Sequence, residues 1–205
     1  MKEAMQKILY YVHDPMCSWC WAFRPIWLEL VRSLPATVTP RRLLGGLAVD
    51  SDEPMPKTMQ SYLQKTWRTI EQQVPGAVFN FDFWELCQPR RSTWPACRGV
   101  IAAREQGLAF EEPMIEAIQH GYYLHARNPS GSGTLMAMAQ EIGLDGDRFA
   151  EQLQSAATRR RLEREMAQGR AMGVSGFPSL VLQEGAGFTR IEHNYLDAQK
   201  ILRQL

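Results

Sequence analysis

The chain has 205 residues, a length that suits one domain with room for an insertion. Its hydrophobic fraction of 45% and charged fraction of 22% are typical of a globular protein with a buried core. Lys and Arg number 23 against 22 Asp and Glu, which leaves no excess charge to attract nucleic acid or an anionic membrane surface. No apolar run is long enough to span a bilayer. We therefore expect neither nucleic acid nor membrane as a partner.

The first predicted elements form a βαβ unit. Residues 8–12 are a continuous apolar run, as expected for a strand buried on both faces. A second strand is expected over residues 37–44, and this order and spacing favour parallel pairing. Pro25 predicts a kink in the intervening helix, or a helix that restarts there. The apolar side chains with amphipathic helical spacing are Phe23, Ile26, Trp27, Leu30, Val31 and Leu34.

From about residue 50 to residue 168 the pattern is helical, with Gly and Pro breakers between the helices. Thr93 is a candidate N-cap for one of them, with Pro95 in its first turn. The apolar face of an earlier helix is expected to consist of Met59, Tyr62, Leu63 and Ile70.

Strand character returns near the end of the chain. Residues 178–183 and 188–191 are separated by a Gly-containing turn, which predicts a β-hairpin. A last helix is expected to start after Asn194 as N-cap and to run to the end of the chain. The sequence therefore predicts an α/β fold interrupted by an all-α insertion, with residues 1–49 and 169–205 in the α/β domain and residues 50–168 in the insertion.

Cys17 and Cys20 stand where a thiolate would be stabilised. They follow the first strand and occupy the first turn of the predicted helix, where unpaired backbone N–H groups and the positive end of the helix dipole favour an anion. A thiolate at such a site has a lowered pKa, and the thiolate is the nucleophile in disulfide exchange. The two-residue spacing also lets the second thiol close an intramolecular disulfide. We predict Cys17 as the attacking thiol and Cys20 as the resolving thiol.

Two alternatives were weighed against a redox pair. A structural zinc site needs four ligands, and Cys87 and Cys97 do not form a second C-x-x-C motif. Simple burial of two thiols does not explain their place at a strand-to-helix turn. We expect no metal site, and we interpret Cys97 as a core thiol and Cys87 as either buried or free.

His13 and Asp14 precede the pair closely, and they are candidates for tuning its pKa or moving protons. In the alternative interpretation, Asp14 caps the turn and His13 simply ends the strand.

A second candidate segment lies far downstream. Pro178 directly precedes a predicted strand, a place where a residue without an N–H is tolerated. If the Phe177–Pro178 bond is cis, the turn leaves the backbone of Phe177 free to pair with an extended peptide. An apolar rim around the thiols is expected from Trp19, Trp21, Phe23 and Phe177.

Taken together, these features resemble the DsbA-like branch of the thioredoxin superfamily. They are the strand, C-x-x-C and helix, a proline five residues after Cys20, the helical insertion, and a Gly-Phe-Pro-Ser turn before a hairpin. Within this branch, Asp-Pro-Met-Cys-Ser-Trp-Cys at residues 14–20 is similar to the Asp-x-x-Cys-x-Trp-Cys motif of FrnE-like proteins and predicted cytosolic protein-disulfide isomerases. The resemblance covers nearly the whole chain.

The resemblance implies a thioredoxin fold (βαβ … ββα) and a thiol–disulfide oxidoreductase or protein-disulfide isomerase that acts through a mixed disulfide. It implies that Cys17 is the nucleophile, that Cys20 resolves the intermediate, and that Pro178 is cis and borders the substrate groove. The expected substrate-binding residues are Phe177, Trp19 and Ser18.

The same resemblance sets the expected partners, which are protein or peptide disulfides and thiols and a recycling thiol system. No cofactor is required, and glutathione is the candidate thiol partner. The polar start of the chain does not resemble an export signal, so a cytoplasmic location is expected.

The alternative function is a glutathione-dependent transferase or isomerase of the kappa-class and hydroxychromene-carboxylate isomerase type. That group shares the insertion topology, but its members generally use a lone Ser or Cys with glutathione. The intact C-x-x-C pair of this chain argues against it.

Overall fold

The computed structural model describes residues 6–205, so the first five residues of the predicted α/β domain lie outside the description. The sheet follows the order β2-β1-β3-β4, with β1 parallel to β2 and antiparallel to β3, and with β3 antiparallel to β4. This arrangement confirms both the predicted βαβ unit and the predicted hairpin. The strands are β1 (Lys7–His13), β2 (Val38–Leu44), β3 (Ser179–Glu184) and β4 (Gly187–Ile191).

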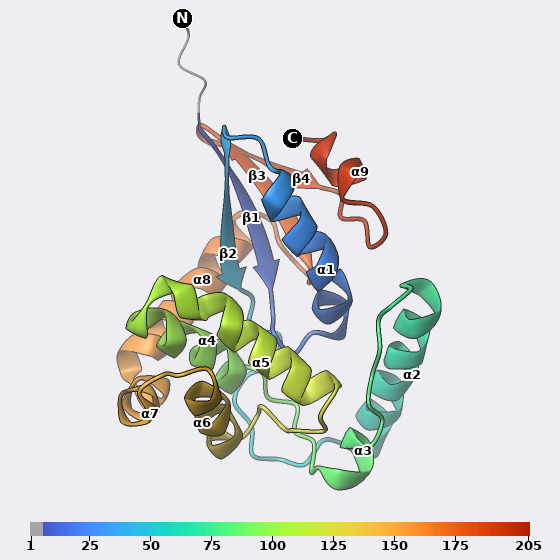
Figure 1. The fold of residues 1–205 in the computed structure, drawn as a ribbon, viewed down its shortest axis with the longest axis vertical. Coiled ribbons are helices and arrows are strands. Elements are labelled where there is room, and N and C mark those ends of the chain that lie inside the picture. Colours follow the sequence, from blue (N-terminus) through green and yellow to red (C-terminus); the bar gives the residue numbers. More distant parts are fainter. Residues whose placement is uncertain (1–5) are drawn as a thin grey trace, which may run out of the picture.

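Helices cover both faces of this sheet (Figure 1). Alternate residues of β1 point to opposite faces, so Leu9 and Tyr11 pack with α1 (Ser18–Ser33) and α9 (Ala198–Leu202), whereas Tyr10 and Val12 face the other way. On that second face lies α8 (Ala156–Ala171), where a Cβ added at Gly169 would sit 3.4 Å from Cγ1 of Val12.

The remaining helices gather at the carboxyl ends of β1 and β2 (Figure 1). Five of them, α5 to α8 and η1, pack around α4, whose side chains from Ala96 to Ala103 are largely buried. Because α8 leads from this cluster back onto the sheet, it runs across the predicted boundary at residues 168 and 169, and the division into domains stays a prediction. The other helices are α2 (Lys57–Gln73), α3 (Phe83–Leu86), α4 (Trp94–Gln106), the 3-10 helix η1 (Leu108–Phe110), α5 (Glu111–Tyr123), α6 (Ser132–Glu141) and α7 (Gly146–Gln154).

One prediction, on the apolar face of α2, needs correction, and the structure excludes one of the two alternatives for α1. Tyr62 was expected on the apolar face of α2, but it is 63% exposed, and Trp67 and Ile70 form the buried face with Gln60. The helix α1 continues through Pro25 to Ser33, so it does not restart at the proline.

The predicted start of the last helix was wrong. Asn194 does not cap it; its Oδ1 accepts hydrogen bonds from the backbone N–H groups of Leu196 and Asp197, at 3.0 and 2.9 Å, and so organises a turn. The N-cap is Asp197, and α9 ends at Leu202 rather than at the end of the chain. Asn serves turns and N-caps equally well, so the sequence signal alone did not separate the two.

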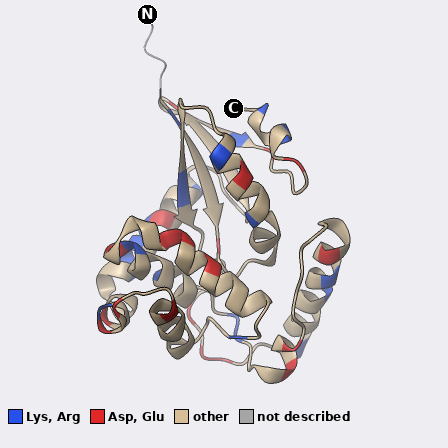
Figure 2. Cartoon of the chain, viewed as in Figure 1, with Lys and Arg blue, Asp and Glu red and all other residues tan. Residues whose placement is uncertain are grey.

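Charged residues of both signs are interspersed over the helices (Figure 2), as the balanced composition predicts. Among residues 6–205, no helix combines the length and the apolar character that crossing a bilayer requires.

Candidate active site

Cys17 occupies the N-cap position of α1, at the junction that follows β1. Its backbone N–H donates to the Asp14 carbonyl at 3.0 Å, and its own carbonyl accepts the first helical hydrogen bond from Trp21 at 3.0 Å. N-cap side chains usually accept a close hydrogen bond from the first helical turn, but the Cys17 thiol forms no such capping bond, and the backbone N–H groups of Trp19 and Cys20 are near enough only to stabilise its thiolate. Instead, its Sγ donates to the Phe177 carbonyl oxygen at 3.6 Å.

The Phe177–Pro178 segment reaches Cys17 because β3 pairs with β1, with Ser179 opposite Val12. The Phe177–Pro178 bond is cis, which confirms what the resemblance implied. The Phe177 ring packs on Gly45 at the end of β2, where an added Cβ would overlap the ring. The missing side chain at Gly45 therefore leaves the space that the Phe177 ring occupies.

The two thiols differ strongly in their surroundings. Hydrogen bonding from the Cys20 thiol lowers the pKa of Cys17, with help from the backbone N–H groups of Cys20 and Trp19, against the opposing effects of burial and the Asp14 charge. Burial raises the pKa of Cys20 well above its ordinary value, and the neighbouring Cys17 adds to the rise. The site therefore favours a thiolate on Cys17 and keeps the proton on Cys20.

The other two residues of the motif face in different directions. The Ser18 hydroxyl is buried and accepts a hydrogen bond from the Trp67 indole Nε1 at 2.9 Å, so it is held against α2. The Trp19 ring is partly exposed and packs on Tyr195 with ring centroids 5.2 Å apart. The contact with Trp67 joins positions 49 residues apart, and no local signal in the sequence predicted it.

Two cavities flank Trp19 and Phe177. One of about 210 Å³ is also lined by Cys17 and Ser18. The other, of about 440 Å³, is lined by Tyr195 and its neighbours. Substrate groups could therefore reach the Cys17 sulfur through the smaller cavity, while the larger cavity adjoins the two rings without bordering Cys17.

The predicted apolar rim is only half correct. Phe23 is 0% exposed and belongs to the core between α1 and the sheet, so it cannot contact a substrate. Trp21 turns toward the insertion, where its Nε1 donates to the Val78 carbonyl at 3.1 Å and its ring stacks on Tyr123. The helix repeat of 3.6 residues turns Trp21 away from the face of α1 that carries Trp19. Phe23 lies one turn after Trp19 on the same face and also contacts Tyr195, but the sheet buries it.

Asp14 is fully buried and makes more contacts than a simple turn cap. Its Oδ1 accepts from the Met16 N–H at 2.8 Å, while its Oδ2 accepts from the Leu47 N–H at 2.7 Å and from the Thr93 hydroxyl at 2.6 Å. The Cys97 thiol donates to the same Oδ2 at 3.5 Å. Burial raises the pKa of Asp14, and these hydrogen bonds work against the rise.

The contacts of Asp14 join three segments that are distant in sequence, and only the turn cap was predicted. Thr93 does occupy the N-cap position of α4, but its side chain caps nothing there and turns to Asp14 instead. Cys97 is a core thiol as predicted, while Cys87 is partly exposed and donates to the Ala126 carbonyl at 2.9 Å.

His13 ends β1 and is buried with its ring stacked on Tyr11, at a centroid distance of 4.8 Å. Burial lowers the pKa of His13 well below its ordinary value, so the ring is neutral. Its Nε2 has no hydrogen-bond partner in the described part of the chain. These contacts place His13 in the core beside the site, and its role in tuning the thiols stays a prediction.

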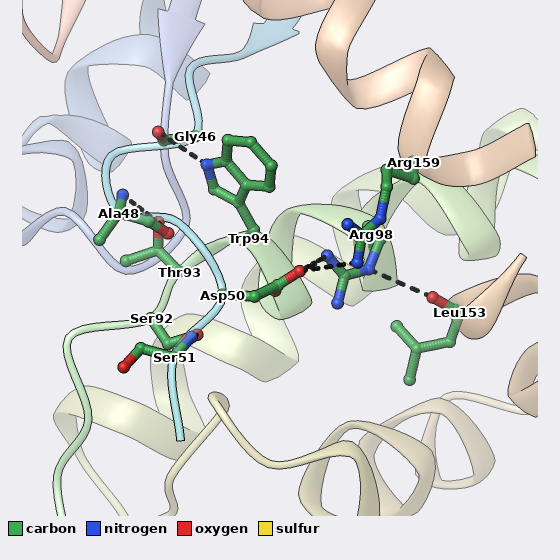
Figure 3. Close-up of polar contacts among 10 residues, drawn as sticks. All are labelled: Gly46, Ala48, Asp50, Ser51, Ser92, Thr93, Trp94, Arg98, Leu153 and Arg159. Carbon is green, nitrogen blue, oxygen red and sulfur yellow. Dashed lines mark hydrogen bonds and ion pairs between the residues drawn. The ribbon is translucent and has the colours of Figure 1, made fainter. Parts of the chain in front are cut away.

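The segment that follows β2 is tied to the start of α4 (Figure 3). The Thr93 N–H donates to the Ala48 carbonyl at 2.9 Å, and the Trp94 indole donates to the Gly46 carbonyl at 3.1 Å. Farther along, Asp50 accepts from Arg98 at 2.8 Å and from Arg159 at 3.1 Å. The bonds of Thr93 and Trp94 hold the start of α4 against the segment that leaves the carboxyl end of β2, next to the end of β1 from which the cysteines follow.

Within residues 6–205, no three or more His, Cys, Asp or Glu side chains are grouped as metal ligands would be. All four cysteines are free thiols.

Residues 10–192 match the model of a family described as thioredoxin. Among curated proteins, the chain is 27% identical over 177 residues to the ClpXP adapter protein SpxH of Halalkalibacterium halodurans. It is 23% identical over 172 residues to SpxH of Bacillus subtilis. These alignments cover 84% of this chain but only 57% and 56% of the two relatives, so the chain spans little more than half of their length.

Solved structures share the fold over nearly the whole chain. A candidate protein disulfide isomerase from Nitrosomonas europaea is 28% identical, with a TM-score of 0.83 over 97% of this chain and 95% of that one. The cytosolic disulfide reductase DsbM from Pseudomonas aeruginosa is 22% identical, with a TM-score of 0.73 over 96% of this chain and 92% of that one. DsbM has also been solved with GSH, and that structure matches with a TM-score of 0.71.

Proposed function

We propose that this chain, which belongs to the thioredoxin family over residues 10–192, is a thiol–disulfide oxidoreductase that works through Cys17 and Cys20. One observation carries the proposal: the Cys17 sulfur lies at the amino end of α1 with a lowered pKa, one turn from a thiol whose pKa is raised. That asymmetry supports attack by Cys17 and resolution by Cys20.

The reaction proceeds by two exchanges. The Cys17 thiolate attacks one sulfur of the substrate disulfide, forms a mixed disulfide, and expels the other substrate sulfur as a thiolate that takes up a proton from solvent. Cys20 then loses its proton and attacks the Cys17 sulfur, which closes the Cys17–Cys20 disulfide and releases the second substrate thiolate. The substrate gains two electrons and the chain loses two. The reverse sequence transfers the disulfide to the substrate.

The substrate is a protein or peptide disulfide or thiol that lies along Phe177 and Trp19. The Phe177 carbonyl already accepts a hydrogen bond from Cys17, which supports its place beside the reacting sulfur. An extended peptide next to the cis proline Pro178 can pair with the backbone of Phe177, while its side chains enter the two flanking cavities.

Glutathione is the proposed recycling thiol, and no resident cofactor is needed. Two glutathione molecules reduce the Cys17–Cys20 disulfide by the same exchange and leave as glutathione disulfide. The structure of DsbM with GSH supports this partner, and the description of DsbM as cytosolic supports a cytoplasmic location for this chain.

The test uses insulin as a protein disulfide with glutathione as the reductant. The substitution Cys17→Ser should abolish the catalysed reduction, because it removes the nucleophile. The substitution Cys20→Ser should trap a covalent adduct of chain and substrate, visible by mass spectrometry and dissolved by excess dithiothreitol. Cys87→Ser is the matched control and should keep the full rate, since burial raises the pKa of this thiol and it lies outside both cavities.

Two outcomes would argue for other functions. Unchanged turnover of the Cys17 variant would end the proposal. Saturable glutathione binding, with an activity on small substrates that survives the loss of Cys20, would favour the glutathione-dependent transferase or isomerase instead.

The curated relatives favour a second candidate, a protein-binding role, because both are named as ClpXP adapters. A binding role does not require the Cys17–Cys20 pair to cycle. Equilibration of the chain in glutathione buffers from reducing to oxidising, read by mass spectrometry after alkylation, separates the two functions. A pair that stays reduced throughout would favour the binding role.

A further inference from the structure

The cavity of about 210 Å³ beside Cys17 has an unbalanced charge. Arg90 and Arg91 both line it, and no Asp or Glu of the described chain does. The whole protein carries a formal charge of only +1, so this excess of positive charge is local to the cavity.

The two arginines differ in their partners. Arg90 pairs with Asp52, with 2.6 Å between Nη1 and Oδ1. Arg91 is half-buried, and no residue between 6 and 205 forms a hydrogen bond or ion pair with its guanidinium. Arg91 and Tyr122 both line the cavity, and the charge of Arg91 partly offsets the rise that burial causes in the pKa of Tyr122. A guanidinium left unpaired at the wall of an enclosed site can accept an anion at little desolvation cost.

The backbone around Arg91 is held on both sides. Arg90 forms an isolated antiparallel bridge with Pro54. On the other side, the Ser92 hydroxyl accepts from the Ser51 N–H at 3.1 Å, and Thr93 is held by Ala48, as Figure 3 shows. The backbone of Arg91 is therefore held in place before a substrate binds, so that recognition has only the side chain to order.

We propose that Arg91 binds a carboxylate of the substrate, and that it thereby selects thiols and disulfides that carry an anionic group near the sulfur. The inference rests on the proposed function, and it adds the substrate class. A guanidinium offers two parallel N–H donors to a carboxylate, a geometry that a neutral group does not satisfy. The cavity is smaller than most ligand pockets, so it suits a short peptide thiol with one carboxylate reaching Arg91.

The test measures binding without any redox step. S-methylglutathione cannot exchange disulfides, and its dimethyl ester lacks both carboxylates while keeping nearly the same shape. By calorimetry, wild-type protein should bind the acid more tightly than the ester, and Arg91→Gln should bind the acid about tenfold more weakly, the scale of one lost hydrogen bond to a charged group. Arg91→Lys should retain part of the affinity, because it keeps the charge but not the paired donors.

Arg160→Gln is the matched control, since it removes the same charge from an exposed position of α8 outside the cavity, and it should leave both affinities unchanged. Equal affinity of the wild type for acid and ester, including no measurable binding of either, would overturn the inference. An equal loss for both ligands in Arg91→Gln would also overturn it, since that result indicates a purely structural role.

A second pair of ligands distinguishes the source of the carboxylate. A peptide with Glu beside S-methylcysteine, compared with its Gln counterpart, tests whether acidic segments of proteins are recognised as well as a free thiol tripeptide. If the protein binds the acidic ligand more tightly than the neutral one in both pairs, its substrates include acidic segments of proteins. If it does so only for S-methylglutathione and its ester, its substrates are small thiols. None of these ligands can exchange disulfides, so the binding result does not depend on the outcome of the insulin assay.

Discussion

Cys17 and Cys97 are two buried thiols near the same carboxylate, Asp14, and they have opposite chemistry. Cys17 is 8% exposed and Cys97 is 0% exposed, so burial alone does not distinguish them by much. Hydrogen bonds from the Cys20 thiol and backbone N–H groups lower the pKa of Cys17. Burial raises the pKa of Cys97 well above its ordinary value, and the charge of Asp14 raises it further.

The difference lies in which polar groups face each sulfur. At the start of α1, Cys17 meets donors, since the first N–H groups of a helix have no partner within the helix. In α4, Cys97 lies in the first turn as well, but its sulfur is turned to the Asp14 Oδ2 at 3.5 Å, an acceptor. A sulfur near a helix start is thus activated only where donors outnumber acceptors around it.

The largest change in this comparison is expected from Asp14→Asn. The substitution replaces one carboxylate oxygen by an NH₂ group, which then faces a donor: the Met16 N–H at the Oδ1 position, or the donors that include the Leu47 N–H at the Oδ2 position. The free energy of unfolding, measured in urea, should therefore fall by about 1 to 3 kcal/mol. The same change removes the negative charge that raises the pKa of Cys17. The thiolate absorbance of Cys17 at 240 nm, followed against pH in the Cys20→Ser background, should therefore shift to lower pH.

Asp147→Asn is the control for Asp14→Asn, because Asp147 is exposed in α7, away from the cysteines. It should change neither the stability nor the titration. If Asp14→Asn also left both unchanged, Asp14 would not link the two thiols, and the comparison would lose its basis.

The part of this arrangement that the sequence predicted is the part made by neighbours in the chain. The burial of the first strand and the place of Cys17 at the start of α1 follow from local hydrophobic pattern and spacing. The cis bond before Pro178 came only from the resemblance, because most X–Pro bonds are trans. The hydrogen bond from Thr93 to Asp14 joins positions 79 residues apart. The sequence predicted Thr93 only as an N-cap and gave no sign of this distant contact.

A smaller effect is expected from Cys97→Ala, which tests whether Cys97 is only a packing residue. Loss of a buried atom the size of a methyl group should cost about 1 kcal/mol in urea unfolding. Asp14 keeps its bonds to Met16, Leu47 and Thr93, so the rate of disulfide exchange should not change. A slowing comparable to that of Cys17→Ser would place Cys97 in the redox chemistry and contradict the contrast drawn between the two thiols.

The smallest effect is the contribution of Cys17 to the dependence of stability on pH. The pKa of Cys17 in the folded chain lies below the ordinary value of 9.0, which applies to the unfolded chain. Between these two pKa values, Cys17 is protonated in the unfolded chain and deprotonated in the folded chain. The free energy of unfolding therefore rises with pH across that interval; the contribution is fully present above 9.0 and is lost as the pH falls through the folded pKa.

Urea unfolding of the reduced wild type and of Cys17→Ser, at a series of pH values, isolates this term as a difference. The difference should grow with pH and level off near 9.0. Cys20 and Cys97, with raised pKa values, contribute only above that pH and with the opposite sign, so the interval below 9.0 reports on Cys17. A difference that stays flat would mean that the donors at the start of α1 do not stabilise the Cys17 thiolate. The distinction between an activated and an inert buried thiol would then have to come from access to the substrate rather than from charge.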